Sequence, residues 1–98
     1  MAVELEIHPA ALDEIQSAAS WYSERSDSAA AAFIAELDKA IEFIVAAPSR
    51  WPLSKHGTRK FVLNRFPFAV FYRFEGSLIQ ILAVANGHRR PGYWKGRS

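Results

Sequence analysis

The stretch from Arg59 to Arg90 constrains the fold more than any other part of this chain. Its sequence, RKFVLNRFPFAVFYRFEGSLIQILAVANGHRR, is dense in aromatic and β-branched residues. Such residues favour extended backbone, so we expect three successive strands at 60–64, 66–74 and 78–85. Glu75 and Gly76 supply a tight turn between the last two strands, because glycine readily adopts the positive φ that hairpin turns need.

The faces of these strands follow from the alternation of side chains along extended backbone. The second strand places one set of mostly aromatic residues on a single face: Phe66, Phe68, Val70, Tyr72 and Phe74. Its other face carries Ala69, Phe71 and Arg73. The third strand is apolar on both faces apart from Gln80. A strand with two apolar faces is typical of the interior of a sheet.

The N-terminal half predicts a strand followed by a helix. Residues 3–7 alternate apolar and acidic side chains, as a half-buried strand does. Pro9 suits the first turn of a helix, where its missing N–H costs nothing. We expect this helix to run to about Arg25, with one face formed by Leu12, Ile15, Ala19 and Tyr22.

A second helix is expected from the alanine run that begins at Ala29 to the residue before Pro48. The serines and aspartate at 26–28 offer caps for its start. Its apolar stripe is formed by Phe33, Leu37, Ile41 and Ile44. The acidic residues of both helices are expected at solvated positions. The loop that follows, 48–57, is rich in Pro, Ser and Gly, and Trp51 is expected to fix it on the core.

The order of elements predicts one α+β domain over residues 1–98. A strand precedes a helical hairpin, and three strands follow it, which gives the order β-α-α-β-β-β. We expect the hairpin to pack on a mostly antiparallel sheet as a two-layer fold. The first strand joins this sheet beside a later strand, and the sequence leaves open which one.

Charge is distributed unequally between the two halves of the chain. Residues 1–50 carry nine acidic and three basic side chains, whereas residues 51–98 carry one acidic and nine basic side chains. The net charge of the whole chain is only +2. Such an asymmetry indicates a basic sheet side that meets something acidic, namely nucleic acid, a ribosome or an acidic protein.

Several kinds of site and location are disfavoured by the sequence. There is no cysteine, and the three histidines (His8, His56 and His88) fall on separate elements. We therefore expect no metal site and no cofactor. The apolar start is interrupted by Glu4 and Glu6, and no stretch approaches the ~20 apolar residues of a membrane span. A cytoplasmic protein without membrane contact is the expectation.

What remains is a set of basic and aromatic residues that we expect on one surface: Arg59, Lys60, Arg65, Arg73, His88, Arg89, Arg90, Tyr93, Trp94, Lys95 and Arg97. Arginine and lysine neutralise phosphates, and aromatic rings stack on unpaired bases. His88 is the member of the set that normally changes its protonation near neutral pH. The structural alternative is that basic residues at a sheet edge only prevent wrong strand pairing.

The whole chain resembles the RelE/ParE superfamily of toxins from type II toxin–antitoxin modules, which includes plasmid stabilisation proteins. The likeness is carried by an ordered set of short motifs: Trp21-Tyr22, the loop from Pro48 to Pro52, Gly57-Thr58-Arg59, FPFAVFY at 66–72, ILAVANGHRRP at 81–91 and YWKGR at 93–97. The resemblance implies a helical hairpin on an antiparallel sheet, which agrees with the expectation from the residues.

Function divides within this superfamily, and the resemblance carries both alternatives. RelE-like members cleave messenger RNA on the ribosome, and ParE-like members poison DNA gyrase. Both are silenced by an antitoxin that wraps the toxin in a hetero-oligomer. The helices and the FPFAVFY strand are more similar to the ParE-like branch. The expectation is a growth-inhibiting toxin that acts on gyrase, with an RNA-cleaving toxin or a non-toxic interaction domain of the same fold as alternatives.

The resemblance also assigns the residues of each alternative. If the chain is a nuclease, His88, Arg89 and Lys60 are the catalytic candidates, and Tyr93 resembles the C-terminal tyrosine of RelE-like members. Two further RelE-type basic positions correspond to Val62 and Ala69 here, so two expected cations are absent. If the chain acts by binding, the target or nucleic-acid surface comprises Arg59, Lys60, Arg65, Arg73, Arg89, Arg90, Tyr93, Trp94 and Arg97.

Overall fold

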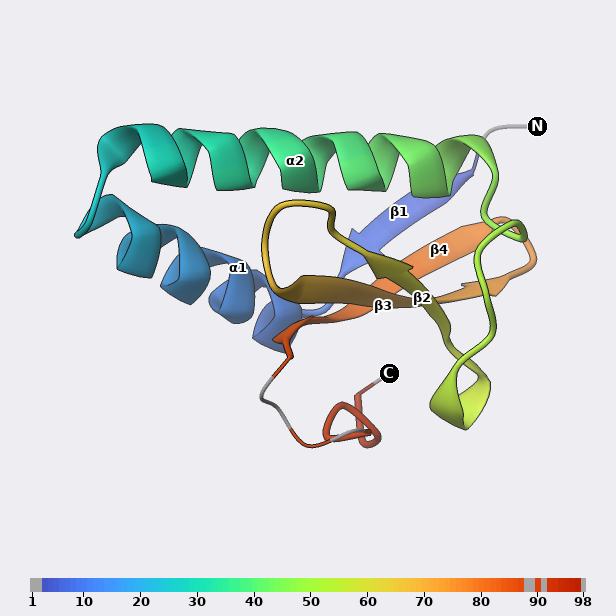
Figure 1. The fold of residues 1–98 in the computed structure, drawn as a ribbon. Coiled ribbons are helices and arrows are strands. Elements are labelled where there is room, and N and C mark those ends of the chain that lie inside the picture. The colour runs from blue at the N-terminus through green and yellow to red at the C-terminus, as the bar shows by residue number, and fades with distance from the viewer. Residues whose placement is uncertain (1–2, 88–89, 91, 98) are drawn as a thin grey trace.

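The computed structural model describes residues 3–87, 90 and 92–97. The elements follow one another as β1 (Glu4–Ile7), α1 (Pro9–Ser23), α2 (Asp27–Ala46), the 3₁₀ turn η1 (Lys55–Gly57), β2 (Arg59–Val62), β3 (Phe68–Glu75) and β4 (Leu78–Asn86) (Figure 1). This order confirms the predicted α+β class and the helical hairpin. In the described residues, neither helix has the length and apolar character that crossing a bilayer requires.

The four strands form one mixed sheet in the order β1-β4-β3-β2. The three C-terminal strands pair antiparallel, as predicted. β1 pairs in parallel with β4, which answers the question that the sequence left open. β4 therefore lies between two neighbours, in agreement with its apolar character on both faces.

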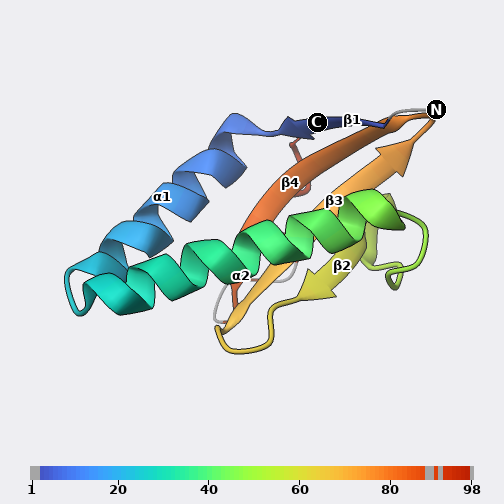
Figure 2. The same cartoon turned by 90° about the horizontal axis from the view of Figure 1, so that it is seen from above.

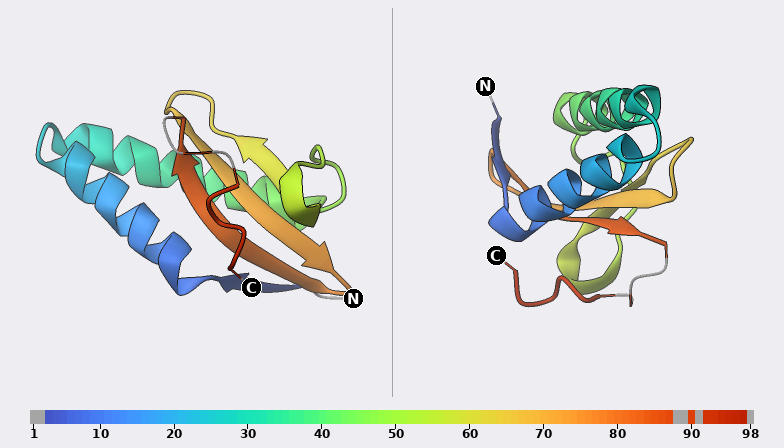
Figure 3. Two further views of the ribbon diagram at one scale, coloured as in Figure 1. Left: turned by 90° about the horizontal axis from the view of Figure 1, so that it is seen from below. Right: turned by 90° about the vertical axis from the view of Figure 1, so that its left-hand side faces the viewer.

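The two helices cover one face of the sheet, and the C-terminal segment crosses the opposite face (Figures 2 and 3). The main core lies between helices and sheet, where the largest fully buried side chains include Phe33, Ile44, Val70, Tyr72, Ile79 and Ile81. A smaller core lies under the C-terminal segment and contains Ala69, Phe71, Leu82, Ala83, Ala85 and Trp94. Both faces of the sheet therefore carry buried apolar residues.

A β-bulge in β4 sets which residues enter each core. Phe71 pairs with Ala83, whereas the next residue, Tyr72, pairs with Ile81, so Leu82 is the extra residue. Leu82 and Ala83 consequently both belong to the smaller core, and the alternation resumes with Val84 in the main core. Strict alternation along the sequence does not reveal this change of phase.

Both helices begin at residues suited to the first turn. The Nδ1 atom of His8 accepts a hydrogen bond from the Ala10 N–H at 3.0 Å, and Pro9 follows as the first helical residue. The Ser26 hydroxyl accepts from the Ala29 N–H at 3.3 Å, and Asp27 lies in the first turn, where its charge favours the helix dipole. The capping predicted for α2 is confirmed.

The expected core face of α1 needs one correction. Leu12 is 44% exposed, and the buried residues of α1 are Ala11, Ile15 and Ala18. The backbone N–H of His8 donates to the Ile81 carbonyl at 2.9 Å, which ties the start of α1 to the sheet. Two of the three buried residues of α1 are small alanines.

The loop before β2 packs on the main core as predicted for Trp51. This ring meets Phe61 edge to face with centroids 4.5 Å apart. The buried Tyr72 hydroxyl donates to the carbonyl of Pro48 at 2.5 Å, and burial raises the pKa of this phenol above its ordinary value. Both contacts join the end of α2 to the sheet.

Strand bounds between β2 and β3 differ from the prediction because Glu36 of α2 holds the connecting loop. The Glu36 carboxylate accepts hydrogen bonds from the backbone N–H groups of Asn64 and Arg65. It also forms an ion pair with the Arg65 guanidinium at 3.1 Å. Residues 63–67 consequently leave the sheet. The expectation that the helix acids are all solvated is wrong for Glu36, whose side chain is only 14% exposed.

These contacts determine the pKa of Glu36. Burial acts to raise it, but the hydrogen bonds and charge supplied by Asn64 and Arg65 outweigh burial, so the pKa lies below its ordinary value. A lowered pKa in the folded state stabilises the fold above the unfolded pKa of the group. That contribution is lost as the pH falls through the folded pKa.

We predict that Glu36→Gln lowers the free energy of unfolding by about 1–2 kcal/mol at pH 7, because it removes charge-assisted hydrogen bonds. Urea unfolding at pH 7 and at pH 3 measures the effect, and the difference from the unsubstituted chain should shrink at pH 3. Glu42→Gln, an exposed position of the same helix, should be neutral. An equal loss of stability at both pH values would contradict the assignment.

Candidate functional site

A pocket of about 430 Å³ opens on the sheet face that is turned away from the helices. We call it the basic pocket. Its floor is formed by apolar residues of β2, β3 and β4, including Val62, Ala69, Phe71 and Ala85. The C-terminal segment borders it through Tyr93 and Trp94. The pocket therefore unites all three strands that the sequence placed at the centre of the fold.

Three cations line the basic pocket, one from each of three separate segments. Lys55 belongs to η1, Lys60 to β2, and Arg90 to the segment after β4. All three residues are exposed. The Lys60 ammonium lies 5.7 Å from the centre of the Phe71 ring, within reach of a cation–π interaction. Such an arrangement favours anionic groups that approach an apolar floor.

The basic pocket also contains the two positions at which RelE-like members are expected to carry further cations. Both positions belong to the floor: Val62 is 62% exposed and Ala69 is buried. Of the three strand positions at which RelE-like members are expected to carry a cation, namely 60, 62 and 69, only position 60 carries one here. An apolar surface occupies the place where two positive charges are expected to stabilise the charge that develops in phosphodiester cleavage.

Trp94 closes one side of the pocket. Its ring stacks on Phe71 with centroids 3.9 Å apart and planes inclined by 26°. Trp94 is 3% exposed and Phe71 is 7% exposed, so each ring is almost fully covered. The prediction placed Trp94 on a target or nucleic-acid surface. The structure instead packs its ring into the smaller core.

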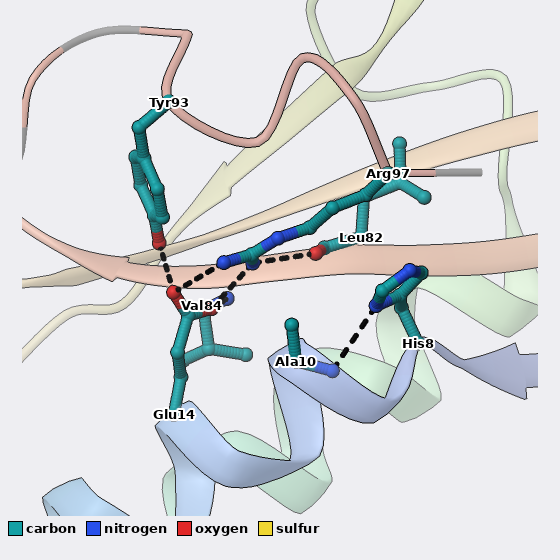
Figure 4. Close-up of polar contacts among 7 residues, drawn as sticks. All are labelled: His8, Ala10, Glu14, Leu82, Val84, Tyr93 and Arg97. Atoms are coloured by element: carbon teal, nitrogen blue, oxygen red, sulfur yellow. Dashed lines mark hydrogen bonds and ion pairs between the residues drawn. The ribbon is translucent and has the colours of Figure 1, made fainter.

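The C-terminal segment is fixed by one carboxylate from α1, that of Glu14 (Figure 4). The Tyr93 hydroxyl donates to Glu14 Oε2 at 2.5 Å. The Arg97 guanidinium donates to both Glu14 oxygens, at 3.0 and 3.3 Å. The side chains of Glu14 and Arg97 are only 15% and 18% exposed. Glu14 is thus a second helix acid for which the expected solvated position is wrong.

The same pair satisfies backbone groups of β4 beyond the end of β1. β1 reaches only to the pairing of Ile7 with Ile81. Past that point the Val84 N–H donates to Glu14 Oε1 at 3.0 Å, and Arg97 donates to the Leu82 carbonyl at 3.0 Å (Figure 4). The Glu14 carboxylate and the Arg97 guanidinium therefore form the hydrogen bonds to β4 that a neighbouring strand would otherwise form.

The remaining predicted site residues lie apart from the basic pocket or outside the described residues. Arg59 donates to the Trp51 carbonyl at 2.7 Å, and Arg73 contacts the His56 carbonyl at 3.3 Å and Glu75 at 3.9 Å. Arg65 is paired with Glu36, as described above. Lys95 is exposed. His88 and Arg89 lie outside the described residues, so the catalytic set assigned to a nuclease stays a prediction.

Sequence reasoning missed two residues that shape this region. Lys55 precedes His56, which adopts a left-handed backbone with φ of 60° that returns the chain toward β2. The Gly57 that follows, with φ of 72°, marks a turn in the sequence, but it does not indicate that Lys55 lines a pocket. Glu14 was missed because the predicted face of α1 was different: in the structure it lies three residues after the buried Ala11 and four before the buried Ala18. In the described residues, no three histidine or acidic side chains cluster in a way that could hold a metal ion.

We predict that Glu14→Gln releases the C-terminal segment, because Arg97 then loses its counter-charge in a partly buried place. The free energy of unfolding should fall by about 1–3 kcal/mol. Trypsin should cleave after Lys95 and Arg97 faster under native conditions. Asp13→Asn, at the exposed neighbouring position, should leave cleavage unchanged. Unaltered cleavage in Glu14→Gln would show that the stacking of Trp94 alone holds the segment.

Comparison with known proteins adds to this geometry. No curated protein sequence matches the chain. A solved structure described as the chromosomal ParDE toxin–antitoxin system from P. aeruginosa shares its fold with a TM-score of 0.74 and 20% sequence identity, over 86% of this chain and 95% of that chain. The family model for the ParE toxin of the type II toxin–antitoxin system parDE matches residues 5–91. The chain therefore belongs to the ParE toxin family of type II toxin–antitoxin systems.

Proposed function

We propose that this ParE family member inhibits bacterial growth by binding DNA gyrase in the cytoplasm, and that a cognate antitoxin neutralises it by forming a hetero-oligomer with it. Membership of the ParE family supports the class of toxin. The observation that carries the mode of action is the composition of the basic pocket. It offers cations for docking, but it has Val62 and Ala69 where an RNA-cleaving relative is expected to carry cations.

The exposed cations of the pocket are the parts of the predicted binding surface best placed to meet a target. Lys60 and Arg90 are exposed there, whereas Arg65 and Arg97 are engaged by carboxylates of the helices. Exposed charges mainly accelerate association and confer salt dependence. Lys60 and Arg90 accordingly dock the target, whereas Tyr93 and Arg97 position the C-terminal segment.

We predict that induced expression without antitoxin halts DNA synthesis before protein synthesis, as measured by separate pulse labelling of the two. The purified chain should inhibit supercoiling by purified gyrase. Lys60→Ala should weaken this inhibition about three- to tenfold, because one docking charge contributes about 1 kcal/mol. Lys39→Ala, an exposed position of α2, is the matched control and should inhibit like the unsubstituted chain.

The alternatives give different results in the same experiments. Early loss of protein synthesis, abolished by His88→Ala or Arg89→Ala, would overturn the gyrase proposal in favour of RNA cleavage. Absence of any arrest, with the folded chain present in the cells, would favour a non-toxic interaction domain. Growth arrest that survives His88→Ala, with gyrase inhibited in vitro, is the outcome that the proposal requires.

A further inference from the structure

In the part of the chain that the structure describes, the three cations of the basic pocket have no carboxylate beside them, unlike four arginines elsewhere. Arg25, Arg65, Arg73 and Arg97 each lie within 4.0 Å of a glutamate oxygen. Among the described residues, Lys55, Lys60 and Arg90 form no such pair, and no acidic side chain lines the pocket. Like charges gathered around one cavity favour an anionic occupant.

The floor of the pocket limits the kind of anion that fits. A nucleobase binds such a surface by stacking on an open aromatic face. Phe71 and Trp94 stack on each other and are almost fully buried, so they offer no such face. The floor beside Lys60 is aliphatic, with Val62, Ala69 and Ala85. Phe68 and Tyr93 also line the pocket and are partly buried, and the Tyr93 hydroxyl is bound by Glu14. The aliphatic part of the floor suits aliphatic side chains that flank a carboxylate.

A buried donor without an acceptor adds to this argument. The indole N–H of Trp94 is buried, and no hydrogen-bond acceptor for it exists in the described part of the chain. Leaving such a donor unpaired is costly, and a partner oxygen removes that cost. Because Trp94 lines the basic pocket, an occupant that shifts this ring slightly gains a donor for a carboxylate or carbonyl oxygen.

We propose that the basic pocket is the docking site for an acidic peptide segment of the antitoxin. A glutamate or aspartate carboxylate of the segment lies among Lys55, Lys60 and Arg90, and neighbouring aliphatic side chains pack on Val62 and Ala69. This inference rests on the proposed function, in which an antitoxin binds the chain. A volume of about 430 Å³ is within the range of cavities that hold a small ligand or a few side chains.

The test follows the indole resonance of Trp94 in the ¹⁵N-labelled full chain, prepared by cell-free synthesis. Trp21→Phe and Trp51→Phe variants assign the three indole signals. The probe is a capped nonapeptide that alternates glutamate with leucine. Its controls are the same peptide with glutamine in place of glutamate, and a decamer of oligouridylate. We expect the glutamate peptide alone to shift the Trp94 signal in a saturable manner and more strongly at low salt.

Substitutions in the pocket test the contribution of each cation. Lys60→Ala and Lys55→Ala should each weaken binding of the glutamate peptide at least fivefold, whereas Lys39→Ala should leave it unchanged. The two pocket variants are independent, so a folding defect in one leaves the other informative. Equal binding of the glutamine peptide, an effect of oligouridylate alone, or no shift with any probe would each overturn the proposal.

The outcome is separable from that of the proposed function, because peptide binding needs neither gyrase nor a growing cell. A chain that arrests DNA synthesis but binds no acidic peptide would retain the proposed function and lose this site. A chain that binds the peptide through Lys60 but arrests nothing would retain the site and lose the proposed toxicity.

Discussion

The difference in length between β1 and β4 is the constraint on which the rest of this structure depends. β1 has four residues and β4 has nine, so half of one edge of β4 lacks a neighbouring strand. An open edge exposes unpaired backbone groups and invites wrong pairing. Here Glu14 accepts from the Val84 N–H and Arg97 donates to the Leu82 carbonyl. The pair that completes the sheet also holds the C-terminal segment against it.

The β-bulge and the C-terminal segment together shape the apolar surface on the sheet face that is turned away from the helices. The bulge turns Leu82 and Ala83 toward that face, where they join Phe71 in an apolar surface. Trp94 covers part of this surface, and the part beyond it forms the floor of the basic pocket. The pocket therefore lies beside Trp94, which borders it. Glu14 of α1 binds Tyr93 and Arg97 in the C-terminal segment, and Tyr93 and Trp94 of this segment border the pocket.

Local patterns predicted the elements of the fold because each element follows from residues near in sequence. Pro9, the serine cap at Ser26 and the turn at Gly76 marked boundaries that the structure confirms. The pairing of β1 with β4 was beyond prediction, because it joins residues more than 70 positions apart. The bulge and the left-handed His56 were likewise hidden, since neither requires a distinctive residue. Lys55, which precedes His56, and Ala85, which follows the bulge, both line the basic pocket.

Ion pairs within the fold explain part of the charge asymmetry of the sequence. The acidic first half and the basic second half meet across the fold, where Glu14 pairs with Arg97 and Glu36 pairs with Arg65. Part of the positive charge that suggested an external partner therefore serves to join the helices to the sheet side. Among the described residues, Lys55, Lys60 and Arg90 form no ion pair and line the basic pocket together. Counting charges along the chain therefore overstates the positive charge that is left for an external partner.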